Sequence, residues 1–159
     1  MQVSLIDLLH EDNILLGVQA EDAAGAIRAL AESLMASGIA EEGYAADAIA
    51  REETFPTGLP TQPIAVAIPH ADPQHVLHSG VAVGLLAQPV TFGQMGTDGS
   101  TRVEASVVFL LAIREKEKQV EMIGQLVALI RSGDFLEQLT IADSPRQALE
   151  LVQLTVANS

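Results

Sequence analysis

Hydrophobic residues along this chain follow two patterns. In some segments they recur with the period of a helix, and in others they form continuous runs. Apolar residues that recur three and four positions apart predict helices with one buried side. Such segments lie at 21–37, 41–53, 120–130, 135–139 and 144–152, after a helical turn at 5–9. The last helix has the clearest start, because the Ser144 hydroxyl can accept an unpaired backbone N–H and Pro145 suits the first turn.

Uninterrupted apolar runs predict buried strands. They lie at 14–18, 64–68, 80–87 and 103–113, and 90–92 could add an edge strand. The run at 80–87 is apolar almost throughout, so we expect it near the centre of a sheet, with both faces covered. The remainder of 88–102 is rich in Gly, Thr and Ser and is expected to be a loop.

The order of these segments sets the expected fold class. Helices and strands alternate without a strict βαβ period, and no internal repeat, low-complexity tract or linker divides the chain. We therefore expect one domain over residues 1–159, of the α/β class. Its architecture would be a three-layer sandwich, with helices flanking a mixed β-sheet of about five strands.

Composition removes several kinds of chemistry. The 159 residues include no cysteine, which excludes disulfides, thiolate metal sites and cysteine nucleophiles. The formal net charge is −13, and the eight Lys and Arg residues are scattered apart from a loose group at 114–118, so nucleic acid binding is not expected. An acidic surface would instead favour a basic protein partner. With neither a basic, apolar leader nor the ~18 apolar residues of a membrane span, the chain is expected to be soluble and cytoplasmic.

Candidate chemistry concentrates in residues 51–78, REETFPTGLPTQPIAVAIPHADPQHVLH. The apolar run that ends at Pro69 places His70 at the end of a strand, where an imidazole would be held but accessible. Neutral imidazole is a competent nucleophile near pH 7. Phosphoryl transfer needs such an aligned nucleophile with cations or hydrogen-bond donors around it. Arg51 could supply the charge and His75 a second donor, and two threonine hydroxyls lie nearby in the sequence, at Thr57 and Thr61.

The residues alone leave other interpretations open. His70 could be a structural histidine with no chemical role. His70, Asp72 and His75 could form a zinc site, although only the pair His75 and His78 has the spacing of helical ligands. The chain contains no G-x-S-x-G elbow and no Walker loop. The glycines at 93, 96 and 99 are more typical of a hairpin connection than of a phosphate cradle.

Two segments carry a resemblance to a known family. The pattern R-E-E-T-F-P-T-G-L followed by I-A-V-A-I-P-H-A-D-P-Q-H-V resembles the active-site region of enzyme IIA domains of the bacterial phosphoenolpyruvate-dependent sugar phosphotransferase system. The similarity is to the fructose–mannitol family, also called type 2, and covers nearly the whole chain, including V-V-F-L-L-A-I and the Phe135–Leu136 region. This resemblance implies that His70 is the phosphorylated residue and that Arg51 lies near it.

The resemblance also distinguishes branches within this family. In the mannitol and fructose branches a second active-site histidine falls where this chain has Gln119. The galactitol-like branch is more similar, because it has the E-F-P-T-G turn and a histidine five residues after the phosphorylated one, which is His75 here. Whether His75 or Gln119 assists the transfer is left open by the sequence.

The family resemblance implies a cytoplasmic phosphocarrier. Such a protein accepts a phosphoryl group on His70 from phospho-HPr and passes it to the cysteine of an enzyme IIB, which serves a membrane enzyme IIC. It uses no cofactor and no metal. The alternative is a regulatory, nitrogen-type IIA-like module that binds its targets according to its phosphorylation, and the E-T-F-P-T-G turn and His75 favour the sugar branch. The imported sugar is not encoded in a carrier that never touches it.

Overall fold

One mixed sheet of five strands organises the computed structural model, which describes residues 4–158. The strands are β1 (Leu9–Val18), β2 (Gly58–Leu59), β3 (Ala65–Ala67), β4 (Gly80–Gly93) and β5 (Arg102–Ala112). Their order across the sheet is β1-β4-β5-β3-β2. β4 pairs parallel with β1 and antiparallel with β5, while β3 pairs parallel with β5 and antiparallel with β2. Residues 1–3 and 159 of the expected domain lie outside the described residues.

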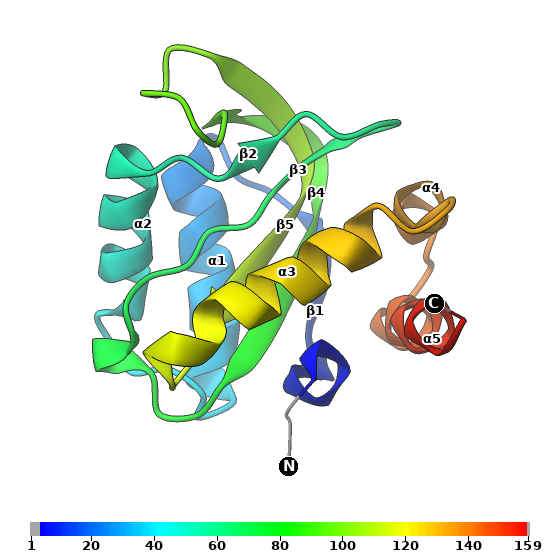
Figure 1. The fold of residues 1–159 in the computed structure, drawn as a ribbon, viewed down its shortest axis with the longest axis horizontal. Coiled ribbons are helices and arrows are strands. Elements are labelled where there is room, and N and C mark those ends of the chain that lie inside the picture. The colour runs from blue at the N-terminus through cyan, green and yellow to red at the C-terminus, as the bar shows by residue number, and fades with distance from the viewer. Residues whose placement is uncertain (1–3, 159) are drawn as a thin grey trace.

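Helices cover both faces of this sheet (Figure 1). One face carries α1 (Ala23–Ala36) and α2 (Tyr44–Thr54). The other carries the 3-10 helix η1 (Leu5–Leu8) with α3 (Gln119–Ile130), α4 (Phe135–Thr140) and α5 (Pro145–Ala157). Two further 3-10 turns, η2 (Pro73–His75) and η3 (Lys116–Lys118), lie in loops. The expected α/β sandwich of three layers is confirmed.

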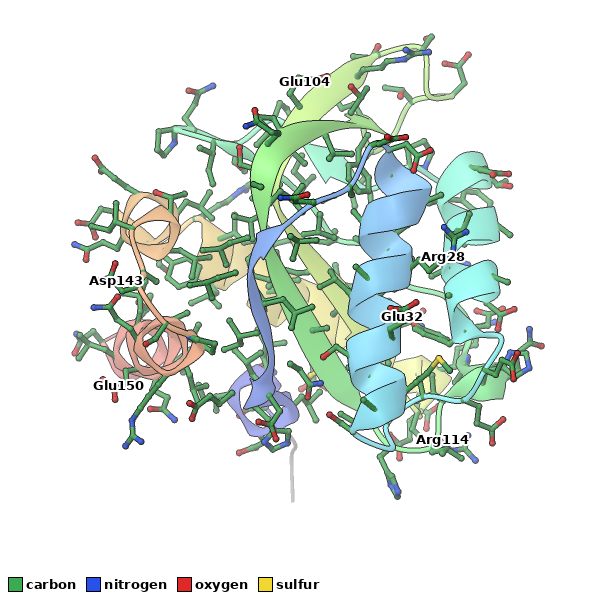
Figure 2. The ribbon with its side chains drawn as sticks, turned by 180° about the vertical axis from the view of Figure 1, so that it is seen from behind. Arg28, Glu32, Glu104, Arg114, Asp143 and Glu150 are labelled. Carbon is green, nitrogen blue, oxygen red and sulfur yellow. The ribbon has the colours of Figure 1, made fainter. Side chains whose placement is uncertain are left out.

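The uninterrupted apolar run of β5 is explained by two separate hydrophobic cores. Successive side chains of a strand point to opposite faces of the sheet. Val107, Phe109 and Leu111 therefore pack under η1, α3, α4 and α5, whereas Val108 and Leu110 pack under α1 and α2. The charged side chains labelled in Figure 2 lie at the periphery, and all six are exposed (Arg28, Glu32, Glu104, Arg114, Asp143 and Glu150). Between residues 4 and 158 no helix has the length and apolar character needed to cross a membrane.

β4 differs from the sequence expectation. A strand at 80–87 and a separate edge strand at 90–92 are expected, but the structure has one strand over 80–93, lying between β1 and β5. The prediction of a separate edge strand is therefore wrong. The register with β5 shifts between Leu85 and Val90, across the segment that contains Pro89. Such an irregularity suits a residue that has no N–H to donate to the ladder.

Other strands also differ from the sequence expectation. β1 begins at Leu9 rather than at residue 14, because the polar residues 10–13 hide its start in the sequence. β3 covers only three residues of the expected run at 64–68, and the two-residue β2 has no sequence signal of its own. The glycine-rich segment is a hairpin connection between β4 and β5, closed by the Gln94 N–H donating to the Thr101 carbonyl at 2.8 Å.

Candidate functional site

His70 lies just beyond the carboxyl end of β3. β3 ends at Ala67, and Pro69, which has no N–H to donate, follows two residues later. β5 still holds the backbone there, because the Leu111 N–H donates to the Pro69 carbonyl at 3.1 Å and His70 forms an isolated parallel bridge with Leu111. The His70 residue is 9% exposed. The strand–proline–histidine pattern thus gives a fixed, mostly buried imidazole at the end of the sheet.

The His70 ring is oriented by its own loop. Its Nδ1 lies 2.9 Å from the Ile68 carbonyl oxygen. Since a carbonyl only accepts, Nδ1 carries the proton and Nε2 of the neutral ring keeps its lone pair. Burial lowers the pKa of His70 below its ordinary value of 6.5, opposed by the bond to Ile68. The Arg51 charge also lowers this pKa, and the Asp72 charge raises it. The ring can therefore act as a nucleophile through Nε2.

A buried carboxylate supports Ile68, the residue whose carbonyl orients this ring. Glu52, 8% exposed, accepts the Thr57 N–H at 2.8 Å and the Thr57 hydroxyl at 2.7 Å. The Thr57 hydroxyl oxygen in turn accepts the Ile68 N–H at 3.2 Å. Burial raises the pKa of Glu52 to about 7, although the two bonds from Thr57 oppose the rise. Glu52 is therefore linked through Thr57 and the Ile68 peptide to the His70 imidazole.

The two threonine hydroxyls considered from the sequence have backbone roles. Thr57 donates to Glu52, and Thr61 donates to the Ile64 carbonyl at 2.6 Å. Both hydroxyl protons are thus used within the segment that leads to β3. They support the loop and are not aimed at a group on His70.

Arg51 comes to the site from the last turn of α2. Its Nη1 lies 3.9 Å from Asp72 Oδ1, and its guanidinium carbon lies 5.1 Å from the centre of the exposed Phe55 ring. Its Nε is buried and donates no hydrogen bond to any residue in the described range 4–158. Since its charge also acts on His70, Arg51 is a cation near the imidazole with donor capacity to spare.

Lys116 is a cation close to the His70 loop that the sequence did not single out. It belongs to η3, and its Nζ lies 3.5 Å from Asp72 Oδ1, the oxygen that Arg51 also approaches. Asp72 follows His70 by two residues, so Lys116 lies at the same end of the sheet. The loose basic group at 114–118 was the only signal in the sequence, and nothing there indicated which of its cations would reach the site.

Side chains from both helical layers hold Ala71, the residue after His70. On one side the Tyr44 hydroxyl of α2 accepts the Ala71 N–H at 3.2 Å and donates to the Leu111 carbonyl at 2.5 Å. On the other side Gln119 Nε2, at the start of α3, donates to the Ala71 carbonyl at 2.8 Å. Burial raises the pKa of Tyr44 far above its ordinary value, so its hydroxyl keeps the proton that it donates. Gln119 therefore acts on the backbone beside His70.

His75 is bonded to α2 and not to His70. Its Nδ1 lies 2.6 Å from Asp47 Oδ2, one helical turn before Arg51. Its ring packs on Gly43, where an added Cβ would lie 2.9 Å from Cε1 and where φ is +107°. A side chain at position 43 would displace this ring. His78 is exposed and lines a separate cavity of about 580 Å³ with Leu77 and Arg114, among others.

The structure does not assemble the metal site considered from the sequence. His70 faces the Ile68 carbonyl, Asp72 faces two cations and His75 faces Asp47. Over the part of the chain that the structure describes, no three His, Cys, Asp or Glu side chains are grouped as metal ligands would be.

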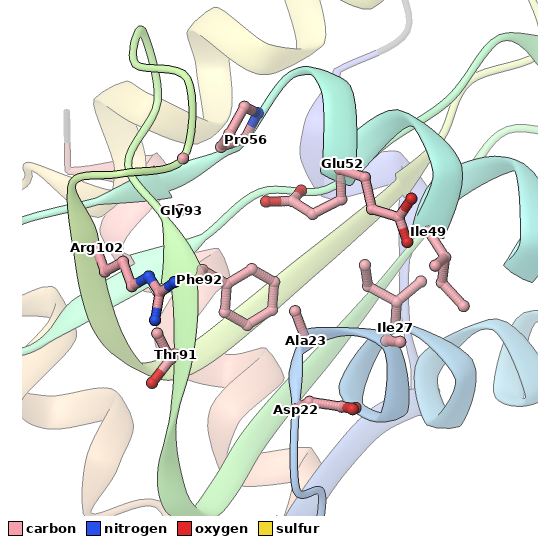
Figure 3. A pocket seen from close by; sticks show the side chains of 13 residues that line it. Asp22, Ala23, Ile27, Ile49, Glu52, Pro56, Thr91, Phe92, Gly93 and Arg102 are labelled. Carbon is pink, nitrogen blue, oxygen red and sulfur yellow. The ribbon is translucent and has the colours of Figure 1, made fainter.

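A second cavity, of about 410 Å³, lies on the α1–α2 side of the sheet (Figure 3). Ile27, Ile49, Phe92 and Arg102 line it, and Glu52 lies in its wall. The carboxyl group that supports the His70 loop therefore borders a hollow on this side of the sheet.

Comparison with known proteins identifies the family to which this chain belongs. Residues 7–154 match the family described as phosphoenolpyruvate-dependent sugar phosphotransferase system, EIIA 2. The chain belongs to this family, and the recognition of a type 2 enzyme IIA from its sequence is confirmed. EIIA components are phosphocarriers, so the chain is a phosphotransferase component.

Individual relatives agree with this assignment. The galactitol-specific EIIA component of the phosphotransferase system of Escherichia coli K12 is 26% identical over 123 residues, which are 77% of this chain and 81% of the relative. The Escherichia coli mannitol enzyme IIA, solved in complex with phosphorylated mannitol enzyme IIB, is 28% identical with a TM-score of 0.76, over 92% of this chain and 99% of that one. The mannitol-specific cryptic enzyme IIA CmtB of Escherichia coli is 25% identical with a TM-score of 0.75, over 96% and 99%.

Proposed function

We propose that this chain is the cytoplasmic phosphocarrier of a sugar phosphotransferase system and that His70 carries the phosphoryl group. It takes the group from phospho-HPr and gives it to the cysteine of a cognate enzyme IIB, which serves a membrane enzyme IIC. The observation that carries the proposal is the bond from His70 Nδ1 to the Ile68 carbonyl, because it leaves Nε2 as the nucleophilic atom of a neutral ring.

The transfer from phospho-HPr to His70 requires no proton transfer. The lone pair of His70 Nε2 attacks phosphorus, a new N–P bond forms, and the N–P bond to the donor histidine of HPr breaks. The electrons of the broken bond return to the donor imidazole. The Nδ1 proton stays in its bond to the Ile68 carbonyl throughout and disperses positive charge on the ring. In the second transfer a thiolate of enzyme IIB attacks the same phosphorus, an S–P bond forms, the N–P bond to His70 Nε2 breaks, and its electrons return to Nε2 as the lone pair of the neutral ring.

Arg51 and His75 complete the proposed site. The phosphoryl transition state spreads negative charge over its equatorial oxygens, which a positioned cation stabilises. Arg51 has the place and the spare donors for this task. His75, oriented by Asp47, is the proposed assisting residue. Gln119 is the weaker candidate, since its amide donor is already bonded to Ala71.

The proposed sugar branch is galactitol-like. The similarity to a galactitol-specific EIIA component supports this choice, together with His75 at its position five residues after His70. An enzyme IIB partner is supported by the likeness to a mannitol enzyme IIA that has been solved with its phosphorylated IIB.

Phosphorylation with purified components tests the proposal. The chain is incubated with phosphoenolpyruvate, enzyme I and HPr, and the product is mapped by mass spectrometry and phosphorus NMR. We expect an acid-labile phosphate on His70 that is absent from His70→Gln and present in the control His78→Gln, whose side chain is exposed. No phosphate in the presence of active upstream proteins, or a phosphate on another histidine, would refute it. Addition of enzymes IIB then tests onward transfer: phosphorylation without transfer to any IIB would favour the regulatory alternative.

A further inference from the structure

Asp72 lies between two cations that come from distant parts of the chain. Its Oδ1 is 3.9 Å from Arg51 Nη1 and 3.5 Å from Lys116 Nζ. Arg51 belongs to α2 and Lys116 to η3, so the two cations come from the segments before β2 and after β5. The Asp72 and Lys116 side chains are 52% and 68% exposed, which leaves them free to change partners. This cluster forms the charged surroundings of the His70 loop.

Arg51 and Asp72 lie close enough to His70 for their charges to act on its ring, and Lys116 joins them through Asp72. Asp72 is two residues from His70, and the charges of both Asp72 and Arg51 act on the His70 imidazole. A phosphoryl group at Nε2 would add up to two negative charges beside an existing carboxylate. Like charges at such separations repel, and cations with several donors bind phosphate oxygens at least as well as a carboxylate. The two anions would therefore compete for the same pair of cations.

We propose that Asp72 holds Arg51 and Lys116 in the unphosphorylated protein, and that both cations move to the phosphoryl oxygens when His70 is phosphorylated. The inference rests on the proposed role of His70. Lys116 is then a second phosphoryl-binding residue, and Asp72 is a positioning residue that keeps both cations at the site while no phosphate is present. Because Asp72 stays beside the phosphoryl group, it raises the free energy of the phosphorylated form and favours onward transfer.

The loop from residue 114 to 118 offers three cations, and only one of them is directed to Asp72. Lys118 Nζ lies 3.9 Å from Glu121, and the Arg114 side chain is exposed, with its backbone N–H bonded to Ser79. Lys116 is thus selected by geometry, and Lys118 provides a control of the same charge two residues away. The buried Nε of Arg51, without an acceptor among residues 4–158, adds a donor that an incoming oxyanion could use.

Equilibrium exchange of the phosphoryl group with HPr tests the inference in the intact chain. Asp72→Asn removes the competing anion, so we expect the exchange constant to shift about three- to tenfold toward the phosphorylated carrier. Lys116→Gln should shift it about three- to tenfold the other way, and the control Lys118→Gln should leave it unchanged. In the Lys116→Gln background, the effect of Asp72→Asn should shrink, because Asp72 and the phosphoryl group then no longer compete for Lys116. Equal constants in all these variants, with His70 still phosphorylated, would overturn the inference and leave the proposed function intact.

A second measurement does not depend on phosphorylation of His70. Inorganic phosphate is titrated into the unphosphorylated chain while the His70 ring and the Lys116 side chain are followed by NMR. Asp72→Asn should bind phosphate several-fold more tightly than the wild type, and Asp72→Asn combined with Lys116→Gln should lose that gain. If phospho-HPr fails to phosphorylate the wild type, the proposed function falls and this titration still decides whether the cation pair is a phosphate site. Identical affinities in all variants would overturn it.

Discussion

The Nδ1 nitrogen of His70 lies 2.9 Å from the carbonyl oxygen of Ile68, so a residue two positions earlier sets the tautomer of the imidazole. Few constraints in the molecule are as local. The nitrogen that keeps a lone pair is therefore fixed before any partner arrives, and under the proposed function a phosphoryl donor has only to approach in line with Nε2.

The first prediction concerns the pH dependence of phosphoryl acceptance. Since burial lowers the pKa of His70 below 6.5, the ring stays neutral when the pH falls through that value. The initial rate of phosphorylation should therefore stay flat as the pH falls through 6.5 and decline only at lower pH. Nitrogen-15 NMR of the ring should show a protonated Nδ1 and an unprotonated Nε2 at pH 7, with the phosphate attached to Nε2 afterwards. A half-maximal rate near pH 6.5 would contradict this environment of His70.

The second prediction concerns Glu52 and the pH dependence of stability. Its pKa is raised from 4.5 to about 7 in the folded chain, so the folded state binds the proton more tightly than the unfolded state. The stabilisation is complete below pH 4.5 and is lost as the pH rises through about 7. The free energy of unfolding should thus fall between pH 5 and pH 8, by about 2 kcal/mol for this group.

Glu52→Gln should remove most of this slope, because glutamine keeps the shape and has no charge to bury. Urea unfolding at pH 5 and pH 8 measures the slope, and Glu53→Gln is the matched control, since that neighbouring side chain is exposed. If the free energy of unfolding changed with pH in the same way in wild type and Glu52→Gln, ionisation of Glu52 would not destabilise the folded chain.

The third prediction separates the effect of Arg51 on transfer from its effect on folding. Its ion pair with Asp72 is long and half-exposed, so Arg51→Ala should lower the free energy of unfolding by less than about 1 kcal/mol. Loss of a cation beside the phosphoryl group should slow transfer from phospho-HPr by on the order of a hundredfold. Rapid-quench kinetics measures the rate, and Arg28→Ala on α1, an exposed arginine, controls for charge. Unchanged kinetics in Arg51→Ala would remove Arg51 from the mechanism.

The fourth prediction distinguishes the two assisting candidates. Gln119→Ala leaves the Ala71 carbonyl without its buried donor, so it should lower the free energy of unfolding by about 1 kcal/mol and also slow transfer. His75→Ala should slow transfer with a smaller loss of stability, because its bond to Asp47 is only partly buried. Comparing the free energy of unfolding with the transfer rate for each variant separates the roles. Wild-type kinetics in His75→Ala would exclude His75 as an assisting residue.

The main features of the site could be predicted from the sequence because they are local. An apolar run, a proline and a histidine stand side by side, and β3 does end at this point with His70 beyond it. The helix that carries Arg51 ends at Thr54, one residue after the end expected from the sequence. The sandwich class follows from the order of apolar segments, which the two cores on either side of β5 explain.

The remaining relationships depend on the fold. Lys116 reaches Asp72 across 44 positions of the sequence, and His75 reaches Asp47 across 28. Nothing in the residue types selects Lys116 over Lys118, because the choice depends on how η3 leads into α3. Likewise, Thr57 could be a ligand for phosphate until the structure shows Glu52 accepting its hydroxyl. Long-range hydrogen-bond partners are set by tertiary packing, which periodicity does not encode.

The bonds to Ala71 couple the segment that holds His70 to both helical layers. Tyr44 holds its N–H from one helical layer and Gln119 holds its carbonyl from the other. Proteins open locally at lower free energies than they unfold globally. Detachment of either layer would release one side of the catalytic segment while most of the sheet persisted. We therefore expect the chain to lose phosphoryl acceptance on warming before its spectroscopic unfolding begins, because detachment of one layer alone disturbs the segment around His70.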